Sequence, residues 1–167
     1  MGYSPIESYG IIGDLRTIAL VSVDGSIDYM CYPLFDSPTV FAALLDDGDG
    51  GRFRIGPAEE ASRRRQMYLP GTNVLMTRFL SESGVGEVID FMPVGEARHT
   101  HAIVRRVRCV RGPFKFRMRC RPRFDYARAG TDIRVEQGDV VFDAERPDGF
   151  SLRLRTPVEV SVADGAA

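Results

Sequence analysis

The chain of 167 residues contains no tryptophan, one lysine and three cysteines. No apolar run approaches the roughly 18 residues of a membrane-spanning helix. Residues 1–5 lack the basic and apolar segments of a secretory signal. The thiols, Cys31, Cys109 and Cys120, are too few and too widely spaced for a disulfide framework or a zinc site. We therefore expect reduced, partly buried thiols in a cytoplasmic protein.

The composition is that of an ordinary globular protein. Apolar residues make up 44% of the chain and charged residues 27%, so enough apolar surface is present to offset the entropy of ordering the chain. The net charge of −1 argues against a general polyanion binder. The length suits one domain, which we expect to span residues 1–167.

Short strands and tight turns dominate the pattern. Five Asp-Gly dipeptides occur, and this dipeptide suits two-residue hairpin turns because both residues tolerate positive φ. Short strands at regular spacing are typical of an all-β antiparallel sandwich. The predicted strand pairs are 19–23 with 26–30, 73–80 with 87–92, 102–111 with 114–124, and 133–136 with 140–144. Two further predicted strands, 150–155 and 158–162, close the chain.

One stretch favours a short helix. Ser37 and Pro38 are typical of a helix start, and residues 39–45 follow them before the acidic, glycine-rich segment 46–51. Residues 158–162 still alternate like a strand when the sequence stops at Ala167. We therefore expect a domain truncated from a longer polypeptide.

The segment 114–124 alternates between apolar and basic residues. Side chains alternate across a strand, so one face would be apolar and the other cationic. Three hypotheses remain open for this basic face: a nucleic-acid or anion patch, a solvated face paired with Glu82, Glu87 and Asp90, or a docking face for another domain. The cations are Lys115, Arg117, Arg119, Arg121 and Arg123.

The sequence contains few residues that indicate a metal site or a pair of catalytic carboxylates. His99 and His101 share a strand face but have no third ligand nearby, and the segment 46–51 lacks the glutamate of a calcium loop. We expect no metal and no cofactor. Carboxylates beside aromatic rings are typical of carbohydrate sites, yet turn-forming roles explain these residues equally well. The carboxylates in question are Asp14, Asp28 and Asp36.

A series of segments carries a family signature. It begins with IESYGIIGDLRT at residues 6–17 and ALVSVDGSIDYMCYPLFDSP at residues 19–38. Further matches are 41–45, 68–70, 73–75, 90–93, 104–107 and 122–126. Together, over residues 3–130, they resemble the N-terminal domain of glycoside hydrolase family 15, the glucoamylase and trehalase-like enzymes. Two positions depart from the usual family spelling: Tyr29 stands for a frequent tryptophan and Leu34 for arginine or glutamate.

The resemblance implies an antiparallel β-supersandwich followed, in the same polypeptide, by an (α/α)6 barrel. That barrel would hold both catalytic glutamates and hydrolyse α-glucosidic bonds of trehalose or an α-glucan with inversion. No catalytic residue is therefore expected in this chain, which would be inactive alone. Phe35 and Asp36 would lie at the surface and face the barrel. The residues expected at this barrel-facing or substrate-rim loop are Tyr29, Tyr32, Pro33, Phe35, Asp36 and Ser37.

Two other functions remain as alternatives. The first is a free-standing carbohydrate-binding module, although the absence of tryptophan removes the largest sugar-stacking ring. The second is a β domain that binds nucleic acid through its basic strand. The oligomeric state is left open.

Overall fold

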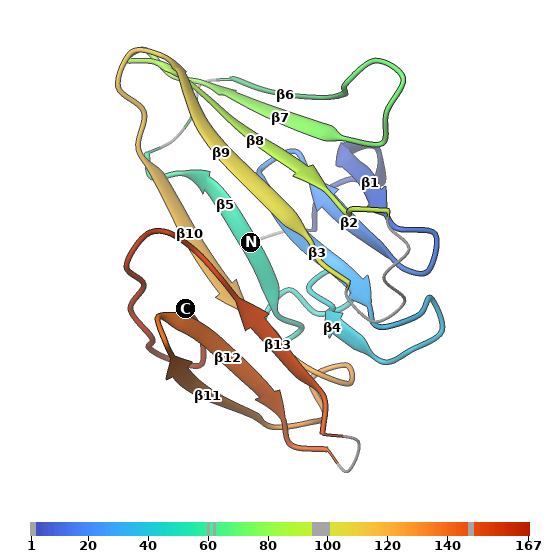
Figure 1. Ribbon diagram of the computed structural model, residues 1–167. Coiled ribbons are helices and arrows are strands. Elements are labelled where there is room, and N and C mark those ends of the chain that lie inside the picture. The colour runs from blue at the N-terminus through green and yellow to red at the C-terminus, as the bar shows by residue number, and fades with distance from the viewer. Residues whose placement is uncertain (1–2, 60, 62, 95–100, 147–148) are drawn as a thin grey trace.

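A computed structural model describes residues 3–59, 61, 63–94, 101–146 and 149–167. They form three antiparallel sheets and one 3-10 turn, η1 (Ile6–Ser8) (Figure 1). Sheet A runs in the order β1 (Tyr9–Gly13), β2 (Ile18–Ser22), β3 (Ser26–Cys31), β5 (Arg52–Pro57) and β10 (Phe116–Arg121), with β4 (Thr39–Phe41) beside β3. Sheet B contains β6 (Arg63–Tyr68), β7 (Leu75–Leu80), β8 (Val85–Phe91) and β9 (Val104–Arg111). Sheet C contains β11 (Thr131–Glu136), β12 (Asp139–Ala144) and β13 (Ser151–Leu154). The expected all-β antiparallel fold is confirmed.

The core lies between the sheets. Ile27 from sheet A, Phe79 from sheet B and Phe142 from sheet C are each 0% exposed and belong to one cluster of buried residues. Strand alternation produces this arrangement, because every second side chain of a strand points inward. The three sheets therefore share one apolar interior.

Three of the predicted hairpins are present: β2–β3, β7–β8 and β11–β12. In the first, Gly25 occupies the turn with φ 82°. Glycine suits this left-handed conformation. Asp24 has no positive φ, however, and three residues separate β2 from β3, so the turn is not the two-residue Asp-Gly turn that the sequence predicts.

The predicted hairpin around Gly112 and Pro113 is wrong. β9 pairs with β8 in sheet B, whereas β10 pairs with β5 in sheet A. The chain turns at Gly112, with φ 63°, but it crosses from one layer of the sandwich to the other. Local turn chemistry is satisfied in either case, so the dipeptide does not determine which strand becomes the partner.

The predicted helix at residues 39–45 is also wrong. Thr39, Val40 and Phe41 form β4, and each is 1% exposed. Three consecutive buried residues suit a strand enclosed on both faces, whereas a short helix buries one side. The backbone is bonded accordingly: the amides of Arg123 and Asp125 donate to the carbonyls of Val40 and Thr39 at 2.9 Å each.

The last predicted strand, 158–162, does not form. Val158 and Val162 are 63% and 40% exposed, and this segment follows β13 without a ladder partner among the described residues. Beyond it, a turn closed by Ala163 and Ala166 brings Ala167 beside Cys120 of β10, where the two residues exchange backbone hydrogen bonds of 2.7 and 2.9 Å. No helix in the described ranges has the length and apolarity to cross a membrane.

Candidate functional site

One end of the sandwich gathers segments that are distant in sequence. The rim loop, which we define as residues 32–38, connects β3 to β4 and lies beside the β1–β2 turn at the right of Figure 1. The Thr17 hydroxyl of that turn donates to the Cys31 carbonyl, just before the loop. His101 contacts both segments, since its ring meets Tyr32 edge-on at 5.3 Å and its Nδ1 lies 2.5 Å from an Asp14 carboxylate oxygen.

The rim loop presents apolar side chains to solvent. Leu34 and Phe35 are 47% and 56% exposed, and Leu15 of the neighbouring turn is 85% exposed. Pro33 is exposed as well. We call Leu15, Pro33, Leu34 and Phe35 the apolar rim. Exposed apolar patches of this kind mark interaction surfaces.

The six residues expected at the rim divide into two groups. Pro33, Phe35 and Asp36 are exposed, whereas Tyr29, Tyr32 and Ser37 are half-buried. The loop is held by its own contacts, because the Leu34 amide donates to the Ser37 hydroxyl at 3.1 Å. Its exposed residues are therefore displayed on an ordered turn.

Asp14 and His101 anchor this end through a nearly buried pair. Their side chains are 8% and 13% exposed. Burial by itself would raise the pKa of Asp14, but hydrogen bonds from His101 and from the amides of Thr17 and Arg16 outweigh it, so the pKa is lowered. Burial raises the pKa of Tyr32, which keeps its phenol neutral. No local sequence pattern indicates this pair, because Asp14 and His101 are 87 positions apart.

Tyr29 contacts Cys31 and not the exposed residues of the rim loop. The Cys31 thiol donates to its hydroxyl at 3.3 Å. This hydrogen bond, followed by burial, raises the pKa of Tyr29. Tyr29 lies opposite Leu20 of β2, and neither residue belongs to the buried core that Ala19 and Met30 join. The side chain of Tyr29 is therefore on the outer face of sheet A.

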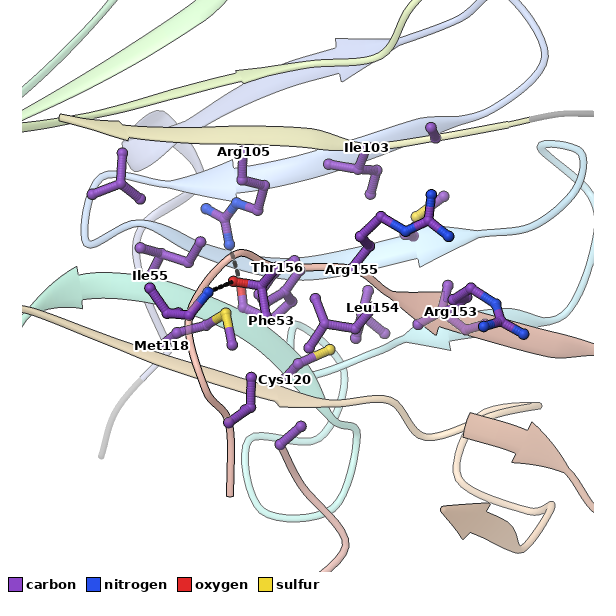
Figure 2. A pocket seen from close by; sticks show the side chains of 18 of the residues that line it. Phe53, Ile55, Ile103, Arg105, Met118, Cys120, Arg153, Leu154, Arg155 and Thr156 are labelled. Atoms are coloured by element: carbon purple, nitrogen blue, oxygen red, sulfur yellow. Dashed lines mark hydrogen bonds between the residues drawn. The ribbon is translucent and has the colours of Figure 1, made fainter. Parts of the chain in front are cut away.

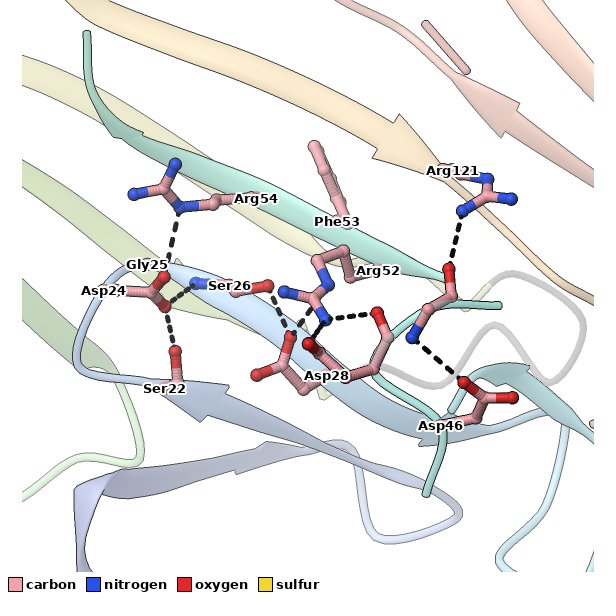
Figure 3. Close-up of polar contacts among 12 residues, drawn as sticks. Ser22, Asp24, Gly25, Ser26, Asp28, Asp46, Arg52, Phe53, Arg54 and Arg121 are labelled. Carbon is pink, nitrogen blue, oxygen red and sulfur yellow. Dashed lines mark hydrogen bonds and ion pairs between the residues drawn. The ribbon is translucent and has the colours of Figure 1, made fainter. Parts of the chain in front are cut away.

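The outer face of sheet A carries a polar network (Figure 3). Asp28 accepts hydrogen bonds from Ser26 at 2.6 Å and Tyr9 at 2.9 Å, and Arg52 lies 3.8 Å away. Burial and the Asp28 hydrogen bond raise the pKa of Tyr9 to about 12. Asp24 pairs with Arg54 at 3.1 Å.

The three early carboxylates are not assembled into one site. Asp14 pairs with His101, Asp28 belongs to the network on the outer face of sheet A, and Asp36 is exposed in the rim loop. Their partners account for Asp14 and Asp28 structurally. A glycosidase pair made from these residues finds no support in the geometry.

The basic strand has the predicted alternation. Lys115, Arg117 and Arg119 are exposed, whereas Arg121 and Arg123 approach Asp49 at 3.2 and 3.6 Å. Opposite them in β5 stand further cations, because Arg119 faces Arg54 and Arg121 faces Arg52. Within the described chain no acidic side chain pairs with Lys115, Arg117 or Arg119.

The expected acidic partners of the basic strand lie elsewhere. Glu87 pairs with Arg78 and Arg108 on sheet B, and Asp90 pairs with Arg105. Glu82 is exposed and makes no ion pair with the described residues. The expected pairing of the basic face with these three acids is therefore wrong, and three of its five cations have no acidic partner among the described residues.

A half-open cavity of about 1110 Å³ lies between the inner face of sheet A, β9 and the segment after β13 (Figure 2). Phe53, Ile55, Met118 and Cys120 line it from sheet A. Because the cavity is half open, it is a cleft beside the core and not an enclosed void within it.

Arg105 lies at the wall of this cavity. Its guanidinium donates to Asp90 at 2.9 and 3.2 Å, to the Phe53 carbonyl at 2.6 Å and to the Gly25 carbonyl at 2.7 Å. The side chains of Arg105 and Asp90 are 3% and 0% exposed. This buried pair ties sheet B to sheet A. Sequence analysis missed it, although Arg105 shares its inward strand parity with Ile103 and Val107.

Metal-ligating residues do not cluster in the part of the chain that the structure describes. His101 is engaged by Asp14, and His99 lies outside the described residues. In the acidic segment, the Asp46 carboxylate accepts from the amides of Gly48 and Asp49 at 2.9 and 3.0 Å. These contacts are those of a turn.

The fold and its exposed end define a class of protein: an antiparallel β-sandwich domain with an apolar rim and a basic strand that is only partly neutralised by acidic side chains. A family model described as "Trehalase-like, N-terminal" matches residues 2–157, so the chain belongs to this family. The chain is 34% identical to the trehalase of Mycolicibacterium smegmatis over 182 residues, covering 96% of this chain and 27% of that protein.

Archaeal relatives give the same picture. The chain is 40% identical to trehalase 1 of Sulfolobus acidocaldarius, with 85% of this chain and 23% of the relative covered. It is 33% identical to the trehalase of Thermoplasma volcanium, with coverages of 87% and 24%. The chain thus spans about a quarter of the length of these curated relatives. No solved structure matches it significantly.

Proposed function

We propose that this chain is the non-catalytic N-terminal domain of a cytoplasmic glycoside hydrolase of family 15 type that acts on trehalose or a related α-glucan. Its role is to stabilise the catalytic (α/α)6 barrel of the same polypeptide and to form one side of the substrate entrance. Hydrolysis would belong to the barrel, whose two glutamates act as acid and base on opposite sides of the bond.

The apolar rim is the observation that supports this role. Phe35 and Leu34 are about half exposed although the loop that bears them is ordered by its own hydrogen bonds. An ordered loop that exposes large apolar side chains suits a surface that a partner covers. A partner within the same polypeptide is supported by the length of the relatives named trehalase, of which this chain covers 27% and 23%.

The test is binding of this chain to its catalytic domain, expressed separately. Phe35→Ser should weaken the complex about tenfold, because about 1.4 kcal/mol of apolar burial is lost. Val135→Ser is the matched control, since Val135 is 61% exposed on β11, away from the rim. Isothermal titration calorimetry measures both, and equal affinities for the two variants would contradict the proposal.

Activity measurements provide a second check. The chain of 167 residues alone should release no glucose from trehalose above the uncatalysed background. Release at a rate comparable to a complete trehalase would overturn the non-catalytic role. Direct binding of trehalose or maltooligosaccharides to the isolated chain would instead indicate a carbohydrate-binding module.

A further inference from the structure

Sheet A ends at β10, and most of the outer edge of this strand is open. Only Cys120 is paired there among the described residues, through its two backbone hydrogen bonds with Ala167. In an antiparallel strand, the N–H and C=O of one residue point to the same side and those of the next to the other. The backbone groups of Phe116 and Met118 therefore point to the open edge, like those of Cys120.

The inner side of this edge is apolar. Phe116, Met118, Cys120 and Ala167 all line the cavity of about 1110 Å³. Ala167 lies opposite Cys120, so the two side chains share the inward face, and Ala167 is 7% exposed. Figure 2 shows Met118 and Cys120 along this wall of the cavity. Apolar side chains added next to Ala167 would extend into the cavity and cover Met118.

The outer side of the same edge is cationic. Lys115, Arg117 and Arg119 are exposed and have no acidic partner in the described chain. Arg119 stands opposite Arg54 of β5, and like charges directly opposite one another destabilise a sheet. Acidic side chains on a neighbouring strand would compensate this charge.

We propose that the open edge of β10 accepts a further β-strand from the longer polypeptide. This inference rests on the proposed function, according to which the chain is part of a longer enzyme. The strand runs antiparallel to β10 and continues the pairing that Ala167 begins with Cys120. Its chemistry alternates: the first residue beyond Ala167 lies opposite Arg119 and is acidic, and the second lies opposite Met118 and is apolar. The third lies opposite Arg117 and is again acidic.

The position of the chain end favours a strand of the same polypeptide over other occupants of the edge. The end of the chain lies beside β10 (Figure 1), so polypeptide that continues from it enters the open edge directly. The curated relatives are about four times as long as their matched regions, which leaves ample chain. A small apolar molecule could fill the cavity, but it would leave the edge of β10 without hydrogen-bond partners.

Amide hydrogen exchange at single-residue resolution tests the pairing. In the 167-residue chain, the amides of Phe116 and Met118 should exchange rapidly. In the polypeptide that includes the catalytic domain, both should slow by about a hundredfold or more. The amides of Arg117 and Arg119 point to β5 and are the internal control, because they should be protected in both proteins.

A charge reversal tests the predicted chemistry of the strand. In the longer polypeptide, Arg119→Glu should abolish the slowing of Met118 exchange. The isolated chain should be at least as stable as before, because Glu would face Arg54. Arg63→Glu, an exposed arginine on β6 of sheet B, should change neither.

Three outcomes of these exchange experiments would contradict the proposal. Rapid exchange of Met118 in the longer polypeptide overturns the proposal, and so does slowing that survives Arg119→Glu. Slowing in the isolated chain that depends on its concentration would assign the edge to a second copy and also overturn it. A docking defect of Phe35→Ser leaves this readout unaffected, so the two proposals fail independently.

Discussion

At the scale of single residues, the ion pair between Asp90 and Arg105 replaces apolar packing at a junction of two sheets. Both Asp90 oxygens accept from the guanidinium, which also donates to two carbonyls of sheet A. The ring of Phe53 lies 4.7 Å from the guanidinium carbon, so the cation is enclosed by partners on several sides. Each partner compensates part of the cost of removing a charge from water.

Removing one charge of this pair should be strongly destabilising. Asp90→Asn preserves the shape of the side chain but leaves a buried cation uncompensated, so we expect a loss of about 3 kcal/mol in the free energy of unfolding. Asp49→Asn is the control: Asp49 is 71% exposed, and its loss should cost less than about 1 kcal/mol. Urea unfolding measures both, and similar midpoints would contradict a structural role for the buried pair.

Asp14 should make stability depend on acid. Its pKa is lowered in the folded chain by His101 and two backbone amides, in spite of burial. The stabilisation is therefore complete above the unfolded value of about 3.9 and is lost as the pH falls through the lower folded value.

Asp14→Asn should flatten this part of the profile, because an amide does not titrate. Thermal unfolding between about pH 2 and pH 6 measures the slope of stability against pH, with Asp36→Asn in the rim loop as the control. An unchanged slope in Asp14→Asn would show that other carboxylates carry the acid sensitivity.

At the scale of elements, two glycine turns allow a controlled comparison. Gly25 and Gly138 have φ values of 82° and 88° in their hairpins. A Cβ on Gly25 would lie 2.1 Å from the Ile55 carbonyl oxygen, whereas a Cβ on Gly138 would meet nothing within 4 Å.

Gly138→Ala should cost about 1 kcal/mol, the penalty of the left-handed conformation alone. Gly25→Ala should cost at least about 2 kcal/mol more, because the β2–β3 turn must move away from β5 and disturb the bond from the Ile55 amide to the Gly25 carbonyl. Denaturant unfolding of both variants measures the difference. Equal losses would mean that the turn relaxes without strain.

The same two kinds of turn show how far local sequence determines a fold. Asp24-Gly25 predicts the β2–β3 hairpin correctly, because the strands on either side of the turn pair with each other, although the turn is one residue longer than predicted. Gly112-Pro113 also marks a real turn, but β10 finds its partner in β5, more than fifty residues earlier. Choice among distant partners depends on the shared core, which a turn signal does not encode.

In the candidate site, too, some features could be predicted from the sequence and others could not. The exposed position of Phe35 and Asp36 follows from the family resemblance of the loop, and the structure has both residues exposed. That they face a barrel stays a prediction. The pairing of Asp14 with His101 joins residues 87 positions apart, and no local pattern distinguishes it from a turn aspartate and an ordinary strand histidine.

At the scale of the whole molecule, the three sheets contribute to one buried cluster. The crossing at Gly112 places consecutive strands in different layers, so neither sheet A nor sheet B can complete its packing independently. Such interdependence predicts cooperative unfolding as one unit. The three cysteine thiols lie in different parts of the fold, so their reactivity can report on this cooperativity.

Thiol labelling should detect this cooperativity. Cys109 is exposed and should react at once, whereas Cys31 and Cys120 are buried, and burial raises the pKa of Cys120 to about 12. Both buried thiols then react only when the chain opens. Asp90→Asn should accelerate labelling of each by about a hundredfold, the factor that corresponds to about 3 kcal/mol when opening precedes reaction in equilibrium.

The comparison between the two buried thiols is decisive. Cys120 lies on the cavity beside Arg105, whereas Cys31 ends β3 next to the rim loop. If Asp90→Asn acts by global unfolding, both thiols accelerate equally and Cys109 does not change. If Cys120 alone accelerates, the cavity opens locally while the rim end stays folded, and the sandwich behaves as two units instead of one.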